Sequence, residues 1–219
     1  MSPRYYPAFI DLKERLCVVV GGGKVAERKV PDLLACGARV KIISPSITRA
    51  LAKQKEKGRI EHLERDYRKG DLKGAFLVIA ATSDDFVNTR VSRDARCLVN
   101  VVDKPGLANF IVPSVVRKGP LAIAISTSGA SPAAARTIRK ELEERYGGEV
   151  GPFLGVLMKL RKRAMKEIHD KKAREAFLKG AASEELFRVL RRAGLQQAEK
   201  RVMQGFEQAR RGSSGQREL

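Results

Sequence analysis

Three small residues near the start of the chain have the spacing of a phosphate-binding turn. Gly21, Gly23 and Ala26 occupy the small-residue positions of the pattern G-x-G-x-x-A, directly after the apolar run LCVVV. In dinucleotide-binding turns the first glycine permits a tight turn and the second lets the backbone approach a pyrophosphate, while the third residue lets the helix lie against the sheet. A glycine turn can also be purely structural. Its position between an expected strand and an expected helix favours nucleotide binding.

The two residues after Gly23 belong to the same turn. Lys24 and Val25 begin the expected helix, whose N-terminal N–H groups would face the pyrophosphate, and we assign both residues to cofactor binding. Val25 stands where a Walker-type loop needs Ser or Thr to bind magnesium, so that kind of phosphate loop is disfavoured.

The end of the second expected strand predicts the adenosine side of the same site. Ser44, Pro45 and Ser46 stand there, and we assign all three to cofactor binding. Many NAD enzymes place an acidic residue at this point to bind the ribose hydroxyls, and this chain has none. Because Lys41 is nearby, the residues themselves leave NADP open beside NAD.

Polar residues also follow two later strands, at the edge of the sheet where ligands bind in such folds. Thr82 and Asn88 are expected to contact the cofactor, although Thr82 or Ser83 could equally cap the helix that carries Asn88. Asp103 follows the last of these strands, where its carboxylate could accept a proton as a hydride leaves the substrate. The alternative role of Asp103 is to cap the turn formed by Lys-Pro-Gly.

A small, polar loop with the sequence STSGAS precedes a later helix. Ser128 in this loop, with Arg136 and Arg139 on the helix, could hold carboxylates of a substrate, because guanidinium groups pair well with them. The same pattern is equally typical of an interface helix with solvated arginines.

The elements that position these residues alternate between strand and helix as far as Asp103. Strands are expected at 6–12, 16–20, 39–44, 60–63, 76–81 and 98–102, with helices at 25–36, 47–57 and 85–96. This alternation predicts an α/β fold with a Rossmann-type doubly wound parallel sheet. Two strands are expected next, at 110–116 and 121–126, then a helix from Pro132 to Tyr146 with Ser131 as its N-cap. The pattern from 154 to 205 is helical throughout.

The composition limits the choice of partner and compartment. The 219 residues carry a formal net charge of +19, which suits nucleic acid, an anionic membrane surface, an acidic small substrate or simply a solvated surface. No apolar run approaches the roughly 20 residues of a membrane span, and the N-terminus lacks the layout of a signal peptide, so we expect a cytoplasmic protein. Cys17, Cys36 and Cys97 are expected to be buried thiols and His62 and His169 surface residues, so no metal site is predicted.

Five sequence blocks occur in the order expected of one family. They are YYPAFIDL, VVGGGKVAERK, AATSDDFVN, NVVDKPGLANFIVPSVVRKG and LAIAISTSGASPAAARTIRKELE. Over about residues 5–146 the chain resembles the siroheme synthase N-terminal family, the precorrin-2 dehydrogenases that in some members are also sirohydrochlorin ferrochelatases. The last two blocks are the most specific, because ordinary dinucleotide-binding folds lack them.

The resemblance implies NAD-dependent oxidation of precorrin-2, a tetrapyrrole with many carboxylates, to sirohydrochlorin, with Asp103 as the catalytic residue. It also implies a homodimer and a preference for NAD. The implied parts are an NAD-binding Rossmann domain (1–112), a small α+β dimerisation domain (113–148) and a helical domain (149–209), and we expect 210–219 to be a disordered tail. Insertion of iron is left open, and Fe²⁺ or Co²⁺ would then be a transient substrate.

Two other functions remain to be distinguished. One is an NAD(H)-sensing regulator that binds DNA through the basic helices, which the charge favours, although no helix-turn-helix pattern is present. The other is the regulatory domain of an ion transporter, which would explain the glycine turn but not NVVDKPG or STSGASP. The main expectation includes neither a nucleic-acid nor a membrane partner.

Overall fold

The computed structural model describes residues 5–214, which divide into two compact units between Val112 and Pro113. The first unit contains a five-stranded sheet in which all strands are parallel, in the order β3-β2-β1-β4-β5. Its strands are β1 (Leu16–Val20), β2 (Arg39–Ile43), β3 (Ile60–Leu63), β4 (Leu77–Ala80) and β5 (Leu98–Val101). The central strands β1 and β4 are almost wholly buried, as expected for a parallel sheet covered on both faces.

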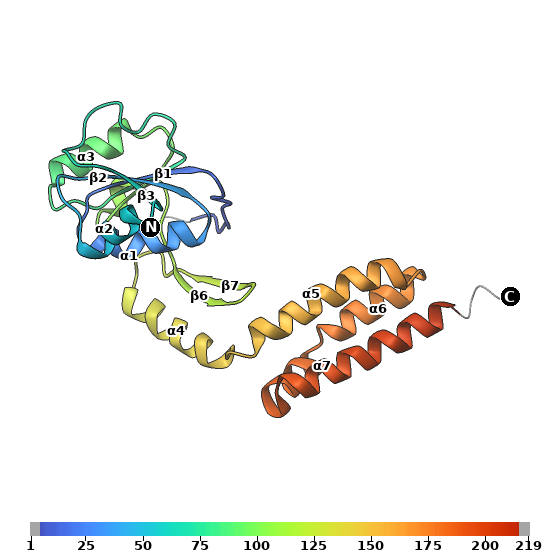
Figure 1. Ribbon diagram of the computed structural model, residues 1–219. Coiled ribbons are helices and arrows are strands. Elements are labelled where there is room, and N and C mark those ends of the chain that lie inside the picture. The colour runs from blue at the N-terminus through green and yellow to red at the C-terminus, as the bar shows by residue number, and fades with distance from the viewer. Residues whose placement is uncertain (1–4, 215–219) are drawn as a thin grey trace. The chain divides into compact units, whose positions relative to one another are not determined.

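Helices cover the two faces of this sheet (Figure 1). Cys17 and Val19 of β1 pack on one side with residues of α1 (Lys24–Ala35) and α2 (Arg49–Glu56). Val18 and Val20 pack on the other side with residues of α3 (Asp85–Asp94). Successive side chains of a strand point to opposite faces, so this unbroken apolar strand supplies both cores. The predicted doubly wound α/β fold is confirmed.

The segment between β3 and β4 contains no helix and still covers one face of the sheet. Tyr67 and Leu72 are 7% and 8% exposed and belong to the same core as Val18 and Val20. A bidentate ion pair joins the two ends of a loop in this segment. In it, the Arg65 guanidinium donates to both carboxylate oxygens of Asp71 at 2.8 Å. Asp71 also accepts the backbone N–H of Arg68.

This ion pair predicts an acid-sensitive contribution to stability. The Arg65 hydrogen bond lowers the pKa of Asp71, so Asp71 stabilises the fold above the ordinary aspartate pKa of about 3.9 and loses this effect as the pH falls below it. Asp71→Asn is expected to lower Tm by roughly 2–5 °C at pH 7, with a smaller difference at pH 3. Thermal unfolding at the two pH values checks this, and an equal difference at both would contradict the ion-pair explanation.

The expected strand at 6–12 is wrong. Residues 5–12 are irregular, and Tyr6 and Phe9 are 91% and 77% exposed. Only Leu12 enters the core, while Pro7 has no N–H to donate to a neighbouring strand. Apolar content alone therefore did not make this segment part of the sheet.

The second unit begins with a small antiparallel sheet of two strands, β6 (Ser114–Lys118) and β7 (Leu121–Ile125). The first of these strands begins later than the expected 110–116, because the chain before it stays attached to β5. Asn109 N–H donates to Val99 O at 3.0 Å, and the Asn100 side chain donates to Phe110 O. Helix α4 (Pro132–Arg145) contacts both strands, and its predicted N-cap Ser131 accepts Ala134 N–H.

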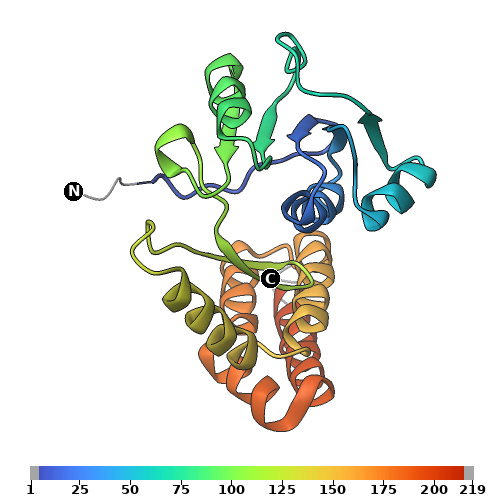
Figure 2. The same cartoon turned by 90° about the vertical axis from the view of Figure 1, so that its left-hand side faces the viewer.

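Three further helices pack around a separate apolar core (Figure 2). They are α5 (Val150–Glu167), α6 (Lys171–Ala181) and α7 (Glu184–Ser214). Helix α7 is interrupted at Gly194, where φ is 80°. Edge-to-face aromatic pairs, Phe153 with Phe187 and Phe177 with Phe206, join the helices. A small antiparallel sheet followed by a helical region is the predicted continuation of the fold.

The expectation of disorder from residue 210 is wrong for residues 210–214, which continue α7. Phe206 is fully buried, and Ala209 packs against the same core. Arg210 forms ion pairs with Glu207 at 2.7 Å and with Glu167 at 3.6 Å. The ion pair with Glu167 of α5 and the packing of Phe206 and Ala209 accompany the continuation of the helix beyond residue 205, where the predicted pattern ends. Residues 215–219 of the expected tail lie outside the described residues.

Candidate functional site

The glycine turn fits closely between the ends of two neighbouring strands. Gly21 follows β1 with φ of 111°, and its N–H donates to Ile43 O at 2.9 Å. A Cβ atom on Gly21 would lie 2.4 Å from Ala81 O, and one on Gly22 would lie 2.0 Å from Ser46 O. Both glycines are therefore required by the packing of the turn itself.

Gly23 differs from its two neighbours. It is the N-cap of α1, it has φ of −82°, and a Cβ atom there would meet nothing within 4 Å. No side chain caps the helix, so the N–H groups of its first turn are available to an anion. Lys24 at the start of the helix is mostly exposed and forms an ion pair with Glu27 at 3.2 Å. This arrangement suits the phosphates of a dinucleotide.

The loop after β2 is held in place by its own polar groups. Ser44 is buried, and its hydroxyl donates to Ser46 O at 2.7 Å. His62 Nε2 donates to Ser44 O at 2.9 Å, and Thr48 N–H donates to Gly22 O at 3.0 Å. His62 is thus half-buried and structural, so its expected place on the surface is wrong, whereas His169 is exposed.

Thr82 and Asn88 form a compact hydrogen-bonded pair beyond β4. The Thr82 hydroxyl donates to Asn88 Oδ1 at 2.9 Å, and Asn88 Nδ2 donates to Thr82 O at 3.0 Å. Asp84 caps α3 by accepting the N–H groups of Phe86 and Val87, so the alternative of a cap at Thr82 or Ser83 is wrong. Asn88 is 4% exposed and orients the Thr82 loop.

These loops enclose a cleft of about 700 Å³ at the carboxyl edge of the sheet. Eight of the nine predicted cofactor residues line it, and Asn88 lies behind Thr82 instead. The eight are Gly21, Gly23, Lys24, Val25, Ser44, Pro45, Ser46 and Thr82. Asp66 and Tyr67, which follow β3, also line the cleft and were not predicted. Their position after a strand of the same sheet was the signal that could have found them.

Asp103 lies at the same edge of the sheet, beyond β5. It is exposed and adopts φ of 59°, a left-handed conformation that Asp and Asn tolerate better than most residues. Within residues 5–214 its carboxylate has no hydrogen-bond or ion-pair partner, so it does not cap the turn that follows. Lys104 anchors this turn to α3 through an ion pair with Asp85 at 2.7 Å.

The three residues assigned to substrate carboxylates belong to the second unit. Ser128 is half-buried with φ of 52°, in a loop where Thr127 and Ser131 exchange hydrogen bonds. Arg139 forms an ion pair with Glu143, whereas Arg136 is exposed on α4. Of these two arginines, Arg136 is the one whose guanidinium forms no ion pair along α4.

The three cysteines differ in burial. Cys17 is buried, which raises the pKa of its thiol to about 11. Cys36 and Cys97 are only half-buried, which corrects the expectation that all three would be buried. In the described part of the chain no group of three or more His, Cys, Asp or Glu residues could hold a metal ion. No helix there is long and apolar enough to cross a membrane.

Comparisons with known proteins agree with this geometry. Residues 8–114 match the family described as putative NAD(P)-binding, and residues 118–145 match the sirohaem biosynthesis protein central family. The chain is 35% identical over 208 residues to siroheme synthase from Photorhabdus laumondii, covering 94% of this chain and 44% of that one. It is 40% identical over 176 residues to siroheme synthase from Thioalkalivibrio sulfidiphilus, covering 79% and 36%. The chain thus spans less than half the length of these curated relatives.

A solved structure extends the likeness to the whole fold. SirC, precorrin-2 dehydrogenase, superposes with a TM-score of 0.79 and 25% identity, covering 91% of this chain and 100% of that chain. The first family match contains the glycine turn, and the second contains the STSGASP loop. On its sequence, its fold and its relatives, this chain matches the siroheme synthase N-terminal-like family in its NAD(P)-binding and central regions.

Proposed function

We propose that this protein is an NAD-dependent precorrin-2 dehydrogenase, which oxidises precorrin-2 to sirohydrochlorin. The observation that carries the proposal is the cleft at the carboxyl edge of the sheet, with an uncapped helix N-terminus at Gly23 and the unpartnered carboxylate of Asp103 at the same edge. The name of the structural neighbour SirC and the siroheme synthase relatives support the substrate.

The residues of the cleft fit a dinucleotide. The open space at Gly23 allows a pyrophosphate to approach, and the N–H groups of the first turn of α1 would bind it. Ser44, Pro45 and Ser46 would contact the adenosine half, and Thr82, held by Asn88, the other side of the cofactor. NAD supplies the hydride acceptor when it is bound.

Asp103 performs the proton transfer in this proposal. Oxidation of precorrin-2 releases a hydride and a proton, and a carboxylate at the edge of the sheet can accept the proton as general base. The left-handed backbone at Asp103 and the Lys104–Asp85 ion pair hold the turn that carries it. The carboxylate of Asp103 is exposed at this edge and has no ion-pair partner within residues 5–214, so it is accessible to a substrate.

Several properties of the family form part of the same proposal. We propose a cytoplasmic homodimer with the three parts 1–112, 113–148 and 149–209. The sheet of β6 and β7 supports the dimer, because two strands alone form a marginal sheet and leave both edges unpaired within the described residues. The basic helices would attract the polycarboxylate substrate. None of the family matches or relatives supports the DNA-binding regulator.

The test is to mix the protein with enzymatically prepared precorrin-2 and NAD, without metal, and to record NADH and sirohydrochlorin spectra together. Equal formation of both products is expected, and it should require NAD. Adding Fe²⁺ or Co²⁺ afterwards tests whether either ion is also a substrate. Failure to form NADH or NADPH with either nucleotide would refute the dehydrogenase.

Arg136→Gln is expected to raise KM for precorrin-2 about tenfold and to leave KM for NAD unchanged, because it removes one charged partner of a substrate carboxylate. Steady-state kinetics with each substrate varied in turn checks the split. Arg145→Gln at the other end of α4 removes the same charge and is the matched control. Equal effects of the two substitutions would show that only the general charge of the helix matters.

A further inference from the structure

The adenosine side of the cleft lacks an acid at the usual place. A carboxylate at the end of the second strand normally binds the ribose hydroxyls of NAD, whereas β2 is followed here by Ser44, Pro45 and Ser46. The hydroxyl of Ser44 already donates to Ser46 O, and Ser44 is only 9% exposed. Another residue must supply the acceptor if the site binds ribose hydroxyls in the usual way.

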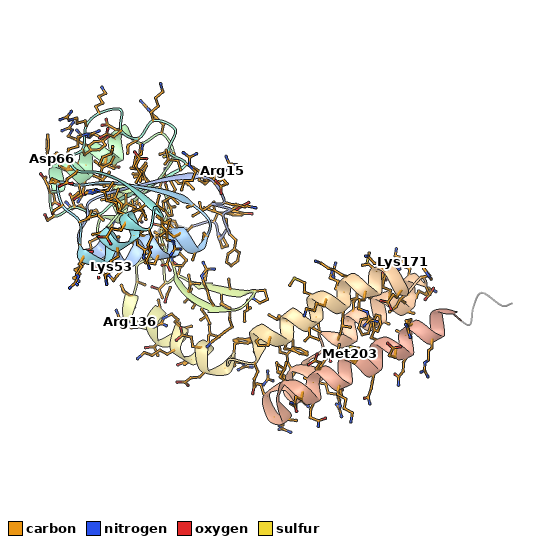
Figure 3. All side chains as sticks on the ribbon, in the orientation of Figure 1. Arg15, Lys53, Asp66, Arg136, Lys171 and Met203 are labelled. Carbon is orange, nitrogen blue, oxygen red and sulfur yellow. The ribbon has the colours of Figure 1, made fainter. Side chains whose placement is uncertain are left out.

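Asp66 is placed to do so from the neighbouring strand. It lies three residues after the end of β3, which pairs with β2 so that Leu63 is opposite Ile43. The structure includes Asp66 in the lining of the cleft together with Ser44, Pro45 and Ser46. Its side chain is exposed at the periphery of the first unit (Figure 3), and no other group in residues 5–214 pairs with the carboxylate.

The backbone on both sides of Asp66 is fixed. Arg65 donates to Asp66 O at 3.0 Å while its guanidinium also holds both oxygens of Asp71. Tyr67 is buried, and its hydroxyl donates to Asp94 Oδ2 at 2.8 Å. An acceptor held by its neighbours in this way loses little conformational freedom when a ligand binds.

The charges of the cleft also distinguish the two nucleotides. Among the described residues that line it, Lys24 is the one cation, and it stands at the start of α1 with Glu27 as its partner. A 2′-phosphate on the adenosine side would meet the carboxylate of Asp66 and no arginine of the lining. Two like charges brought together in this way would disfavour NADP.

From this geometry we propose that Asp66 accepts hydrogen bonds from the adenosine ribose hydroxyls and thereby selects NAD over NADP, an inference that rests on the proposed cofactor site. Asp66 then replaces the acid that is absent after β2. It is a specificity residue, and it takes no part in the transfer of hydride or proton.

The test compares the binding of NADH and NADPH to the wild-type protein and to Asp66→Asn by titration calorimetry. The wild type is expected to bind NADH more tightly than NADPH. Asp66→Asn is expected to weaken NADH binding about tenfold or more and to leave NADPH binding unchanged or improved. Glu64→Gln removes the same charge two residues earlier, outside the lining of the cleft, and should behave like the wild type.

Each other result has a distinct meaning. If the wild type binds neither nucleotide, the proposed cofactor site fails, and this inference fails with it. If the wild type binds NADH but Asp66→Asn binds it equally well, the role of Asp66 is refuted while the cofactor site stands. Equal weakening by Asp66→Asn and Glu64→Gln would also refute it. Thermal unfolding of both variants shows whether either substitution has disturbed the fold.

Discussion

Asp103→Asn is expected to fold normally, to bind NADH like the wild type and to lose at least about 100-fold in the rate of precorrin-2 oxidation. Removal of a general base typically costs 10²–10⁴-fold, because the proton then has no positioned acceptor in the transition state. Asparagine is nearly isosteric with aspartate and also tolerates the left-handed conformation at this position, where φ is 59°. The substitution therefore removes the charge and the basicity while keeping the backbone.

The measurement is single-turnover formation of NADH, with calorimetry of NADH binding beside it. Asp85→Asn is a suitable control, because it breaks the ion pair with Lys104 next to Asp103 and leaves Asp103 itself intact. Since Asp85 and Lys104 are 72% and 38% exposed, we expect the control to lose only a few-fold in rate. Turnover of Asp103→Asn within a few-fold of the wild type would remove Asp103 from the mechanism.

Gly23→Ala is expected to preserve the stability of the protein and to weaken NADH binding at least about tenfold. Gly23 has φ of −82°, which alanine adopts easily, and its added Cβ would meet no protein atom within 4 Å. The methyl group would instead occupy the space through which the backbone approaches a pyrophosphate. Gly23→Ala is therefore expected to weaken NADH binding while the fold is retained.

Gly21→Ala is the opposite case in the same turn and is expected to lower the free energy of unfolding by about 3 kcal/mol or more. Its φ of 111° is strained for alanine, and the added Cβ would lie 2.4 Å from Ala81 O. Urea unfolding and NADH titration of both variants separate the two effects. If Gly23→Ala bound NADH like the wild type, the pyrophosphate would not lie at this turn, and the proposed cofactor site would need revision.

Much of the site could be predicted because its signals are local. The apolar run before Gly21 and the helical pattern after Gly23 are enough to place a strand–turn–helix unit, whatever surrounds it. Ser131 and Pro132 indicate the start of α4 in the same local way, since a cap needs only its own helix. Parallel strands then bring Ser44, Thr82 and Asp103 to one edge of the sheet, as expected from the alternation of elements.

Other features depended on neighbours that are distant in sequence. The apolar segment around Phe9 is not a strand, because strand formation needs a partner edge and only Leu12 reaches the core. Likewise, α7 continues to Ser214 because Phe206 and Arg210 contact α5. Neither outcome follows from the composition of the segment itself.

The sequence by itself therefore determined the glycine turn, the order of strands and helices and the family, because these depend on the identity and spacing of nearby residues. Only the tertiary structure decided that Asn88 supports Thr82 from behind, that His62 holds the end of β2 and that Asp66 enters the cleft. His62 and Ser44 are 18 residues apart and meet because β2 pairs with β3, and the same pairing brings the loop that carries Asp66 beside the loop after β2. Thr82 and Asn88 are only six residues apart, but their contact depends on how α3 packs against β4.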